Sequence, residues 1–311
     1  MRKEAMNENH VTISAIQDYH QRNDYAVNYA FSGFTANKYF TSDRYEPLDE
    51  NFRRPSGAPL MGYGIEVETE CRGVRNESVL AEVFDKIIFP HFPADLFKMQ
   101  YDGSLGGDTS AECITQVMTK AFIRNHYKDF KTMFNTYFPA FNISADSANT
   151  CCGMHVNISN ALFGKTTMKQ EEAIRKLYYI VNRHYNLCCG LFYRAGSTAY
   201  CGQMNYTNAR NMYIGGGSHG TCINMSHFDE GRIELRLPGG QRNYACFRNT
   251  MESVFFLVDR VKELTWDECD DIKTIFKGCN QYVYDRLSSR CGLSASVLEP
   301  IRASMVTENL L

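Results

Sequence analysis

The amino-acid sequence predicts an α+β fold in which helices cover one face of an antiparallel or mixed sheet. Short segments with alternating apolar and polar residues, typical of strands, are separated by longer segments with apolar residues every three or four positions, typical of helices. Two late strand segments, 221–226 and 232–237, also follow each other closely enough to form a hairpin.

The predicted strands lie at residues 64–69, 96–101, 111–114, 154–159, 221–226 and 232–237. The predicted helices lie at residues 77–89, 116–137, 167–193, 245–264 and 271–290. Pro90 is expected to end the first helix, because proline interrupts helical hydrogen bonding. His184 and Lys176 are expected at solvated positions of the third helix.

The N-terminal part of the sequence differs from the rest. Residues 1–60 are polar and aromatic with little periodicity, and three prolines fall between residues 45 and 59. These residues are predicted to form an irregular arm. Residues 61–311 show no linker or internal repeat and are predicted to form one domain with a helical C-terminal extension.

Length and composition are those of an ordinary soluble globular protein. The chain has 311 residues, of which 44% are hydrophobic and 22% charged, and its formal net charge of −2 gives no basic footprint for nucleic acid or a membrane surface. No apolar run approaches the roughly 20 residues of a membrane-spanning helix. The first residues also lack the apolar core of a signal peptide. We therefore expect a cytoplasmic protein that binds neither nucleic acid nor membrane.

Twelve cysteines raise the question of metal ligands or disulfides. No Cys-x-x-Cys spacing occurs, and the adjacent pairs at 151–152 and 188–189 are poorly placed for one zinc ion or for ordinary bridges. The favoured interpretation is a set of buried free thiols in a reducing compartment.

Two carboxylates share one face of the first predicted strand. Successive side chains of a strand point to opposite faces, so Glu66 and Glu68 project together while Ile65 and Val67 face the other side. Like charges two residues apart repel unless a cation or a basic group lies between them. The pair is a candidate for binding Mg²⁺, which takes one or two carboxylates plus phosphate oxygens. A solvated strand is the alternative, since Glu-x-Glu is common.

A histidine and a third acid extend this candidate set. His155 shares one face of its strand with Asn157 and Ser159, and Glu112 falls in an otherwise apolar strand segment, where an acid needs a partner. Both are candidate metal ligands. The alternatives are a structural histidine and an acid with a structural partner. The Asp-Gly-Ser turn at 102–104 needs no functional explanation.

The last predicted strand places a carboxylate between two guanidinium groups. Arg232, Glu234 and Arg236 share one face, and arginines can hold phosphate through paired hydrogen bonds. The alternative is an ion-pair ladder across a sheet. Arg210 is a further candidate for contacting phosphate or a substrate carboxylate, and Arg194 ranks below it. The simplest account of the three polar faces is a shared cleft that holds divalent metal and phosphate.

A glycine-rich stretch at 215–220 precedes the hairpin, and Gly216 within it is a candidate for close approach to a nucleotide. The stretch is not a Walker A loop, because no Gly-Lys-Ser/Thr follows it. A flexible lead-in to the hairpin would need no ligand.

Taken in order, these motifs resemble those of the glutamine-synthetase-like carboxylate–amine ligases, in the amidoligase branch. Residues 64–68 look like the family's Glu-x-Glu strand, 152–159 like its Gly-Met-His segment and 232–238 like its Arg-x-Glu-x-Arg-x-Pro strand. The resemblance covers residues 61–260. It implies a curved antiparallel sheet that forms a funnel between ATP and the acceptor, with helices on the outer face, so that residues 61–311 would be an amidoligase-like catalytic domain.

The resemblance also implies roles for individual residues. Its metal ligands would be Glu66, His155 and Glu234 for the ion nearer the transferred phosphate, and Glu68 and Glu112 for a second ion. Phosphate and acyl phosphate would be contacted by Arg232 and Arg236. The cofactors would be ATP and Mg²⁺, with Mn²⁺ as a substitute.

Together with the residue patterns, this gives two further predicted sets. The catalytic set is Arg232, Arg236 and Arg210, and the ATP-binding set is Asn157, Ser159, Arg232 and Gly216.

The implied reaction is ATP-dependent ligation of a carbon–nitrogen bond. A small or peptidyl carboxylate is activated as an acyl phosphate, and an amine then attacks it. Asn157 stands where glutamine synthetases often have a second histidine, and Gly239 follows Pro238 where they often have an acid. We therefore expect an organic amine in place of ammonia, and the family's ring-forming members allow an oligomer.

Two alternatives stay open. One is a non-catalytic binding or structural protein that keeps the fold. The other is a related phosphotransfer enzyme of the glutamate–cysteine-ligase or guanidino-kinase kind.

Overall fold

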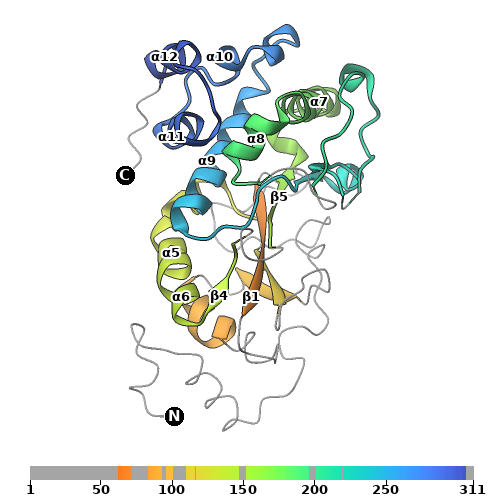
Figure 1. The fold of residues 1–311 in the computed structure, drawn as a ribbon. Coiled ribbons are helices and arrows are strands. Elements are labelled where there is room, and N and C mark those ends of the chain that lie inside the picture. The colour runs from red at the N-terminus through yellow and green to blue at the C-terminus, as the bar shows by residue number, and fades with distance from the viewer. Residues whose placement is uncertain are drawn as a thin grey trace, which may run out of the picture. The chain divides into compact units, whose positions relative to one another are not determined.

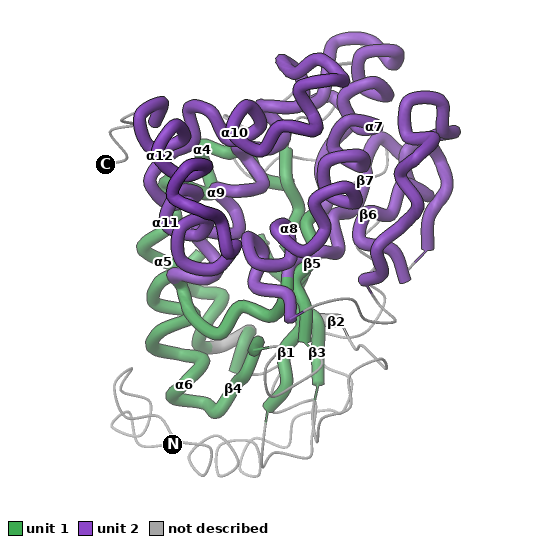
Figure 2. The backbone as a smooth tube through the Cα atoms, turned by 45° about the horizontal axis from the view of Figure 1, so that its top comes forward, with its two compact units in different colours: residues 1–58, 62–156, 239–244 green, residues 59–61, 157–238, 245–311 purple. Residues whose placement is uncertain are grey.

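A computed structural model describes most of the chain from residue 62 onward, in the ranges 62–71, 83–92, 96–100, 110–115, 117–146, 152–195, 201–218 and 220–305. These residues divide into two compact units, coloured separately in Figure 2. Unit 1 contains residues 62–156 and 239–244, and unit 2 contains residues 157–238 and 245–305. The predicted arm at 1–60 and the turn at 102–104 lie outside the described residues.

An antiparallel sheet accompanied by helices makes up the described chain, which confirms the predicted α+β class (Figure 1). The strands are hydrogen-bonded in the order β2-β3-β1-β5-β7-β6, with β4 pairing β1. Their bounds are Tyr63–Cys71 (β1), Phe97–Gln100 (β2), Ser110–Thr115 (β3), Ile143–Ser144 (β4), Met154–Ser159 (β5), Ile223–Asn224 (β6) and Arg232–Leu235 (β7). Because β2 and β6 are the two ends of this order, the sheet does not close on itself. All six predicted strands are confirmed.

In unit 1 a helix packs on the sheet face opposite the acids. Directly paired residues of antiparallel strands point to the same face, and Phe97 of β2 pairs with Thr115 of β3 while Glu68 pairs with Glu112 on the other face. The ring of Phe97 lies 6.1 Å from that of Phe130 in helix α5 (Tyr127–Thr132). Apolar packing therefore occupies one face of this half of the sheet and leaves the other to the acids.

The helix predicted over 116–137 is broken into shorter pieces. These are α4 (Lys120–Asn125), α5, a π-helical turn (Met133–Tyr137) and α6 (Phe138–Ala140). The first piece begins only after Thr119, whose Oγ accepts a hydrogen bond from Phe122 N at 3.1 Å. His126 separates α4 from α5. Pro139 lies in the first turn of α6, where a missing N–H costs nothing, so the helical path runs past its predicted end.

The helix predicted over 77–89 is described only from residue 83. A π-helical turn (Phe84–Ile88) leads into a 3₁₀ turn (Phe89–His91). The π-helical turn ends directly before Pro90, as predicted, and Pro90 then stands near the start of the 3₁₀ turn, where its nitrogen needs no hydrogen bond.

The helices from residue 167 onward are α7 (Thr167–Arg183), α8 (Tyr185–Leu191), α9 (Tyr244–Arg260), α10 (Ile272–Ile275), α11 (Gln281–Arg290) and α12 (Ala295–Ala303). The predicted helix over 167–193 is broken at His184, and the one over 271–290 is broken before α11, where Gly278 has a φ of 74°. Helix α12 was not predicted.

Two residues that were expected to be exposed to solvent, one on α7 and one directly after it, are not, so this prediction was wrong. The side chain of Lys176 is only 8% exposed, and its Nζ lies 2.7 Å from Glu172. His184 is half-buried, with Nε2 3.1 Å from the carbonyl oxygen of Cys269.

The predicted hairpin forms from β6 and β7, which pair with Asn224 opposite Glu234. Its connection contains a 3₁₀ turn (Phe228–Glu230) and Gly231, whose φ of 89° favours glycine.

The thiol prediction is confirmed for every cysteine that the structure describes, since all are free and all but Cys291 are buried. Across the same part of the chain, no helix is both long enough and apolar enough to cross a membrane.

Candidate functional site

An acidic stripe runs along one face of unit 1. We use this name for Glu66, Glu68 and Glu70 of β1 with Glu112 of β3. Glu68 and Glu112 are directly paired across the two strands. Glu70 was not predicted, because the expected strand ended one residue before it. The alternation that selects the first two acids would also select Glu70, which is buried and pairs with Ser110.

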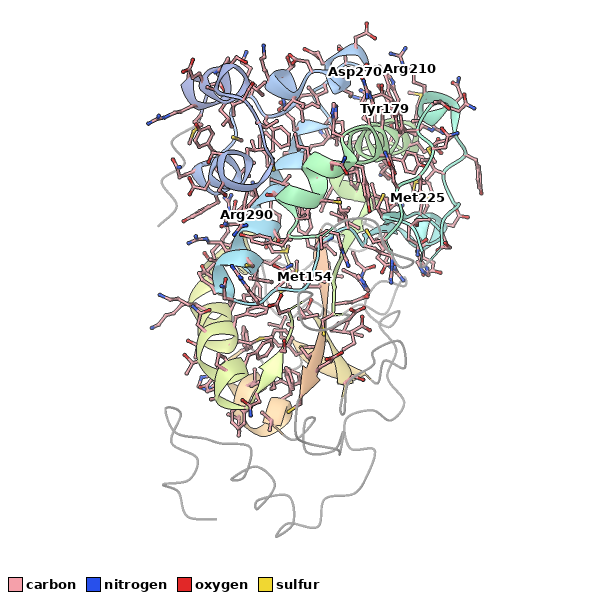
Figure 3. The ribbon with its side chains drawn as sticks, viewed as in Figure 1. Met154, Tyr179, Arg210, Met225, Asp270 and Arg290 are labelled. Atoms are coloured by element: carbon pink, nitrogen blue, oxygen red, sulfur yellow. The ribbon has the colours of Figure 1, made fainter. Side chains whose placement is uncertain are left out.

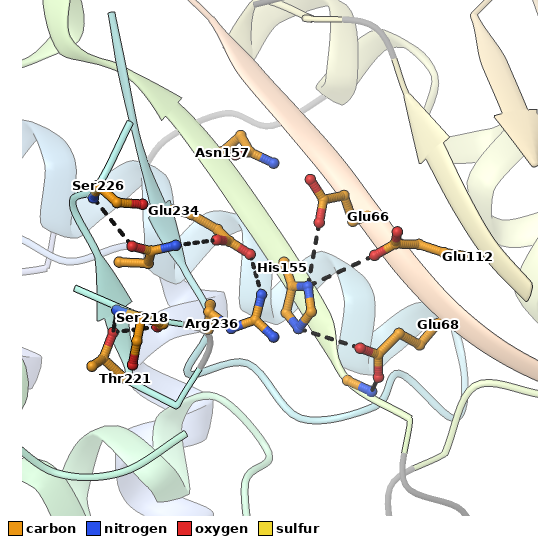
Figure 4. Close-up of polar contacts among 12 residues, drawn as sticks. Glu66, Glu68, Glu112, His155, Asn157, Ser218, Thr221, Ser226, Glu234 and Arg236 are labelled. Atoms are coloured by element: carbon orange, nitrogen blue, oxygen red, sulfur yellow. Dashed lines mark hydrogen bonds and ion pairs between the residues drawn. The ribbon is translucent and has the colours of Figure 1, made fainter. Parts of the chain in front are cut away.

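His155 of β5 lies among three acids of the stripe (Figure 4). Its Nδ1 is 3.3 Å from Glu66 Oε2 and 3.8 Å from Glu112 Oε1. Its Nε2 is 3.4 Å from Glu68 Oε1. Both ring nitrogens therefore face carboxylates.

Three of these residues have the spacing of metal ligands. One atom from each of Glu66, Glu112 and His155 lies within 4.8 Å of the others. In an octahedral site with bonds of about 2.1 Å, ligand atoms lie roughly 3–4 Å apart, so the observed set would need only a small closing movement. Two carboxylates and one imidazole suit Mn²⁺ and Zn²⁺ as well as Mg²⁺.

The charge of the cluster also favours a cation. When ionised, Glu66, Glu68 and Glu112 contribute three negative charges, and His155 contributes at most one positive charge, which leaves −2. The four side chains are 14%, 9%, 14% and 7% exposed. Acidic side chains with little exposure to water favour a nearby cation, and one divalent ion would balance the excess of acid over base among these four side chains.

Glu68 is held differently from the other two acids. Its Oε2 accepts a hydrogen bond from Gly153 N, while Oε1 faces His155 Nε2. The structure thus groups Glu112 with Glu66 and His155 and leaves Glu68 on the far nitrogen, whereas the resemblance implied a shared ion for Glu68 and Glu112.

The arginines of β7 and its extension lie in unit 2 and are buried. Arg236 Nη1 donates to Glu234 Oε1 at 2.5 Å, and Arg232 Nη1 donates to Asn157 Oδ1 at 2.7 Å. Ser159, at the end of β5, is buried as well. The structure therefore brings Glu234 to Arg236 and Asn157 to Arg232 as hydrogen-bonded pairs.

One member of this arrangement was missed by the sequence analysis. Asn224 of β6 stands opposite Glu234, and its Nδ2 donates to Glu234 Oε2 at 3.0 Å. Both carboxylate oxygens of Glu234 thus accept a hydrogen bond. The register of the predicted hairpin could have indicated Asn224, because it fixes which residue faces Glu234.

The remaining candidate arginines serve other contacts. Arg194 donates to the carbonyl oxygens of Arg236, Leu237 and Pro238 at 3.1, 3.1 and 2.7 Å, which holds the chain beyond β7. Arg210 is exposed (Figure 3), pairs with Asp267 at 2.8 Å and lies over the ring of Trp266 at 5.3 Å.

Gly216, the candidate for close approach to a nucleotide, is exposed, and its carbonyl oxygen accepts a hydrogen bond from Met225 N at 3.1 Å. This contact ties the glycine-rich stretch to the end of β6.

No protein-family model matches this chain, and no curated protein matches it significantly. The resemblance to carboxylate–amine ligases accordingly rests on the three motifs and their order.

Proposed function

We propose that this protein is an ATP-dependent carboxylate–amine ligase that requires a divalent metal ion, Mg²⁺ or Mn²⁺. The strongest support is the buried cluster of Glu66, Glu68 and Glu112 around His155, because its donor atoms and its charge suit a divalent cation. The order of the acidic, histidine and arginine motifs along the chain supports a ligase among the metal-dependent functions.

In this proposal Glu66, Glu112 and His155 hold the first ion, and Glu68 contributes to a second. Bound metal supplies charge neutralisation for phosphoryl transfer. Gly153 N keeps the Glu68 carboxylate in a fixed orientation, which lowers the entropic cost of binding.

The arginines act on phosphate oxygens. Arg232, held by Asn157, and Arg236, held by Glu234, would contact the transferred phosphoryl group. Buried guanidinium groups fixed in advance stabilise developing charge without reorganising. ATP would further contact Asn157, Ser159 and the stretch around Gly216.

The reaction has two steps. A substrate carboxylate oxygen bonds to the γ-phosphorus of ATP, and ADP leaves. The nitrogen of an organic amine then bonds to the acyl carbon, inorganic phosphate leaves, and the nitrogen loses a proton. The proposal includes a funnel-shaped sheet that admits ATP and the acceptor separately, as the resemblance implies. It also includes a cytoplasmic location, which the composition of the chain favours.

Mg²⁺-dependent ADP release, measured across a panel of amino acids, polyamines and short peptides, tests this proposal. We expect release that requires both a carboxylate and an amine. Glu66→Gln should lower the rate by roughly a hundredfold or more, since a metal ligand contributes several kcal/mol to the transition state. The matched control is Glu263→Gln, at an acid whose side chain is 68% exposed, and it should behave as wild type.

Other outcomes would select the alternatives. No ADP release together with no Mg-ATP binding by calorimetry would favour a binding protein. A phosphorylated guanidino product without an amide would favour the phosphotransfer enzyme.

A further inference from the structure

The carboxylate of Glu234 is fixed from two sides within unit 2. Arg236 Nη1 donates to Oε1 at 2.5 Å, and Asn224 Nδ2 donates to Oε2 at 3.0 Å. All three residues are buried. A guanidinium group is a rigid plane with five N–H donors, so a hydrogen bond from Nη1 to a held carboxylate restricts the directions in which Arg236 can present its other donors.

Asn224 is itself held in one orientation. Its Oδ1 accepts a hydrogen bond from Ser226 N at 3.1 Å, so the amide cannot turn over without losing that bond. Its Nδ2 must then point to Glu234.

Gly217 leaves room for this arrangement. A Cβ atom at residue 217 would lie 2.7 Å from Asn224 Oδ1 and 2.9 Å from Met225 N, and its φ of 137° disfavours any other residue. Glycine at residue 217 therefore has a structural reason that needs no ligand, because its backbone packs directly against Asn224.

From these contacts we infer that Asn224 is a positioning residue that acts through Glu234 to orient Arg236 for phosphate. This inference rests on the proposed function. It assigns Glu234 to orienting an arginine, whereas the resemblance assigns Glu234 to a metal ion. The two assignments predict different behaviour for a variant in which the acid and the amide swap places.

The double variant N224D/E234Q makes this swap. In Asn224→Asp alone, a carboxylate oxygen replaces the donor beside Glu234, and the contact becomes repulsive. When Glu234→Gln is added, the new amide can donate to the new carboxylate and still accept from Arg236 through its oxygen. A positioning role is then restored, but a metal ligand is not.

Two readouts separate this inference from the proposed function. The first uses the ligand-free protein labelled with ¹⁵N-arginine, in which the signal lost in Arg236→Lys reports solvent exchange at that guanidinium. The second is the kcat for ADP release, with Mn²⁺ affinity measured beside it.

We expect exchange at Arg236 to be about tenfold faster in Asn224→Asp and to slow again in the double variant, because a hydrogen bond to a charged group governs at least a factor of ten. The kcat should fall by about tenfold or more and partly recover in the double variant, with unchanged Mn²⁺ affinity. The control is Asn280→Asp, at a buried asparagine that donates to Glu252 Oε2 and accepts from Val283 N, and it should not alter exchange at Arg236.

Unchanged exchange in Asn224→Asp, or no recovery in the double variant, would overturn the inference. Absence of ADP release in the wild type would overturn the proposed function, while solvent exchange at Arg236 would still decide the role of Asn224.

Discussion

At the scale of single residues, the candidate site brings several carboxylates close together. Glu68 and Glu112 are directly paired across β1 and β3, and Glu66 lies two positions along the same face. Like charges directly opposite destabilise an antiparallel pair. His155 offsets part of this repulsion through both of its ring nitrogens. A chain with this arrangement is expected to be less stable without a cation than with one.

Glu112→Gln should therefore change stability in opposite directions with and without metal. In EDTA the variant should melt about 1–3 °C higher than wild type, because one of the opposed charges is gone. With Mn²⁺ the wild type should gain more stability than the variant, since the variant has lost a ligand. Thermal unfolding in the two buffers measures both effects. An equal loss of Tm in both buffers would show that Glu112 is a structural acid.

At the scale of elements, the break between α7 and α8 shows a tertiary contact that interrupts a helix. Apolar periodicity continues through it, since Ile180, Leu187 and Cys188 are all buried. His184 has a φ of −108° and a ψ of 37°, and its Nε2 lies 3.1 Å from Cys269 O. The pattern predicted one helix because periodicity does not register a contact with a residue 85 positions away.

The burial of His184 makes stability depend on pH. Burial lowers the pKa of His184 from 6.5, with Arg183 adding to the effect and Cys269 O and Asp270 opposing it. The unfolded chain then binds the proton more readily, so stability falls as the pH drops below 6.5 toward the lower folded pKa. His184→Gln should reduce this loss in urea unfolding at about pH 7.5 and 5.5. An identical pH dependence in both proteins would contradict the expectation.

Helix α11 depends on a cap that is also tied to a buried acid. Asn280 Oδ1 accepts from Val283 N at 3.1 Å, and its Nδ2 donates to the buried Glu252 at 2.9 Å. Asn280→Ala should cost roughly 2–4 kcal/mol, because it removes both a cap and a donor to a buried carboxylate. Thr166→Ala, at the exposed cap of α7, should cost about 1 kcal/mol or less. Equal costs in urea unfolding would show that the bond to Glu252 contributes nothing.

At the scale of the whole molecule, the sequence predicted the strands of the sheet better than the bounds of the helices. The strands with polar faces were predicted because alternation reports directly which side chains share a face, as for Glu66 and Glu68. Glu70 was missed only through the predicted end of the strand. Asn224 was missed because its role depends on register, and the burial of Lys176 was missed because a single sequence shows no packing partner. The division into two units has no signal in composition or linkers.

The many buried thiols give a further test on the whole chain. Burial raises the pKa of Cys71 and of Cys222 to about 12, so few of their thiols are ionised at neutral pH. The described cysteines other than Cys291 should react slowly with a thiol reagent in the native protein. When the protein is unfolded without a reducing agent, all twelve cysteines should react with the thiol reagent. A shortfall after unfolding would reveal disulfides and contradict the free-thiol assignment.

The most direct test of the central claim is Mn²⁺ binding by the purified protein, followed by electron paramagnetic resonance beside Glu66→Gln and the control Glu263→Gln. We predict saturable binding to wild type and to the control, and binding weakened by about tenfold or more in Glu66→Gln, as expected for the loss of one charged ligand. No binding to wild type up to millimolar Mn²⁺, or equal binding by Glu66→Gln, would contradict a metal site at Glu66, Glu112 and His155.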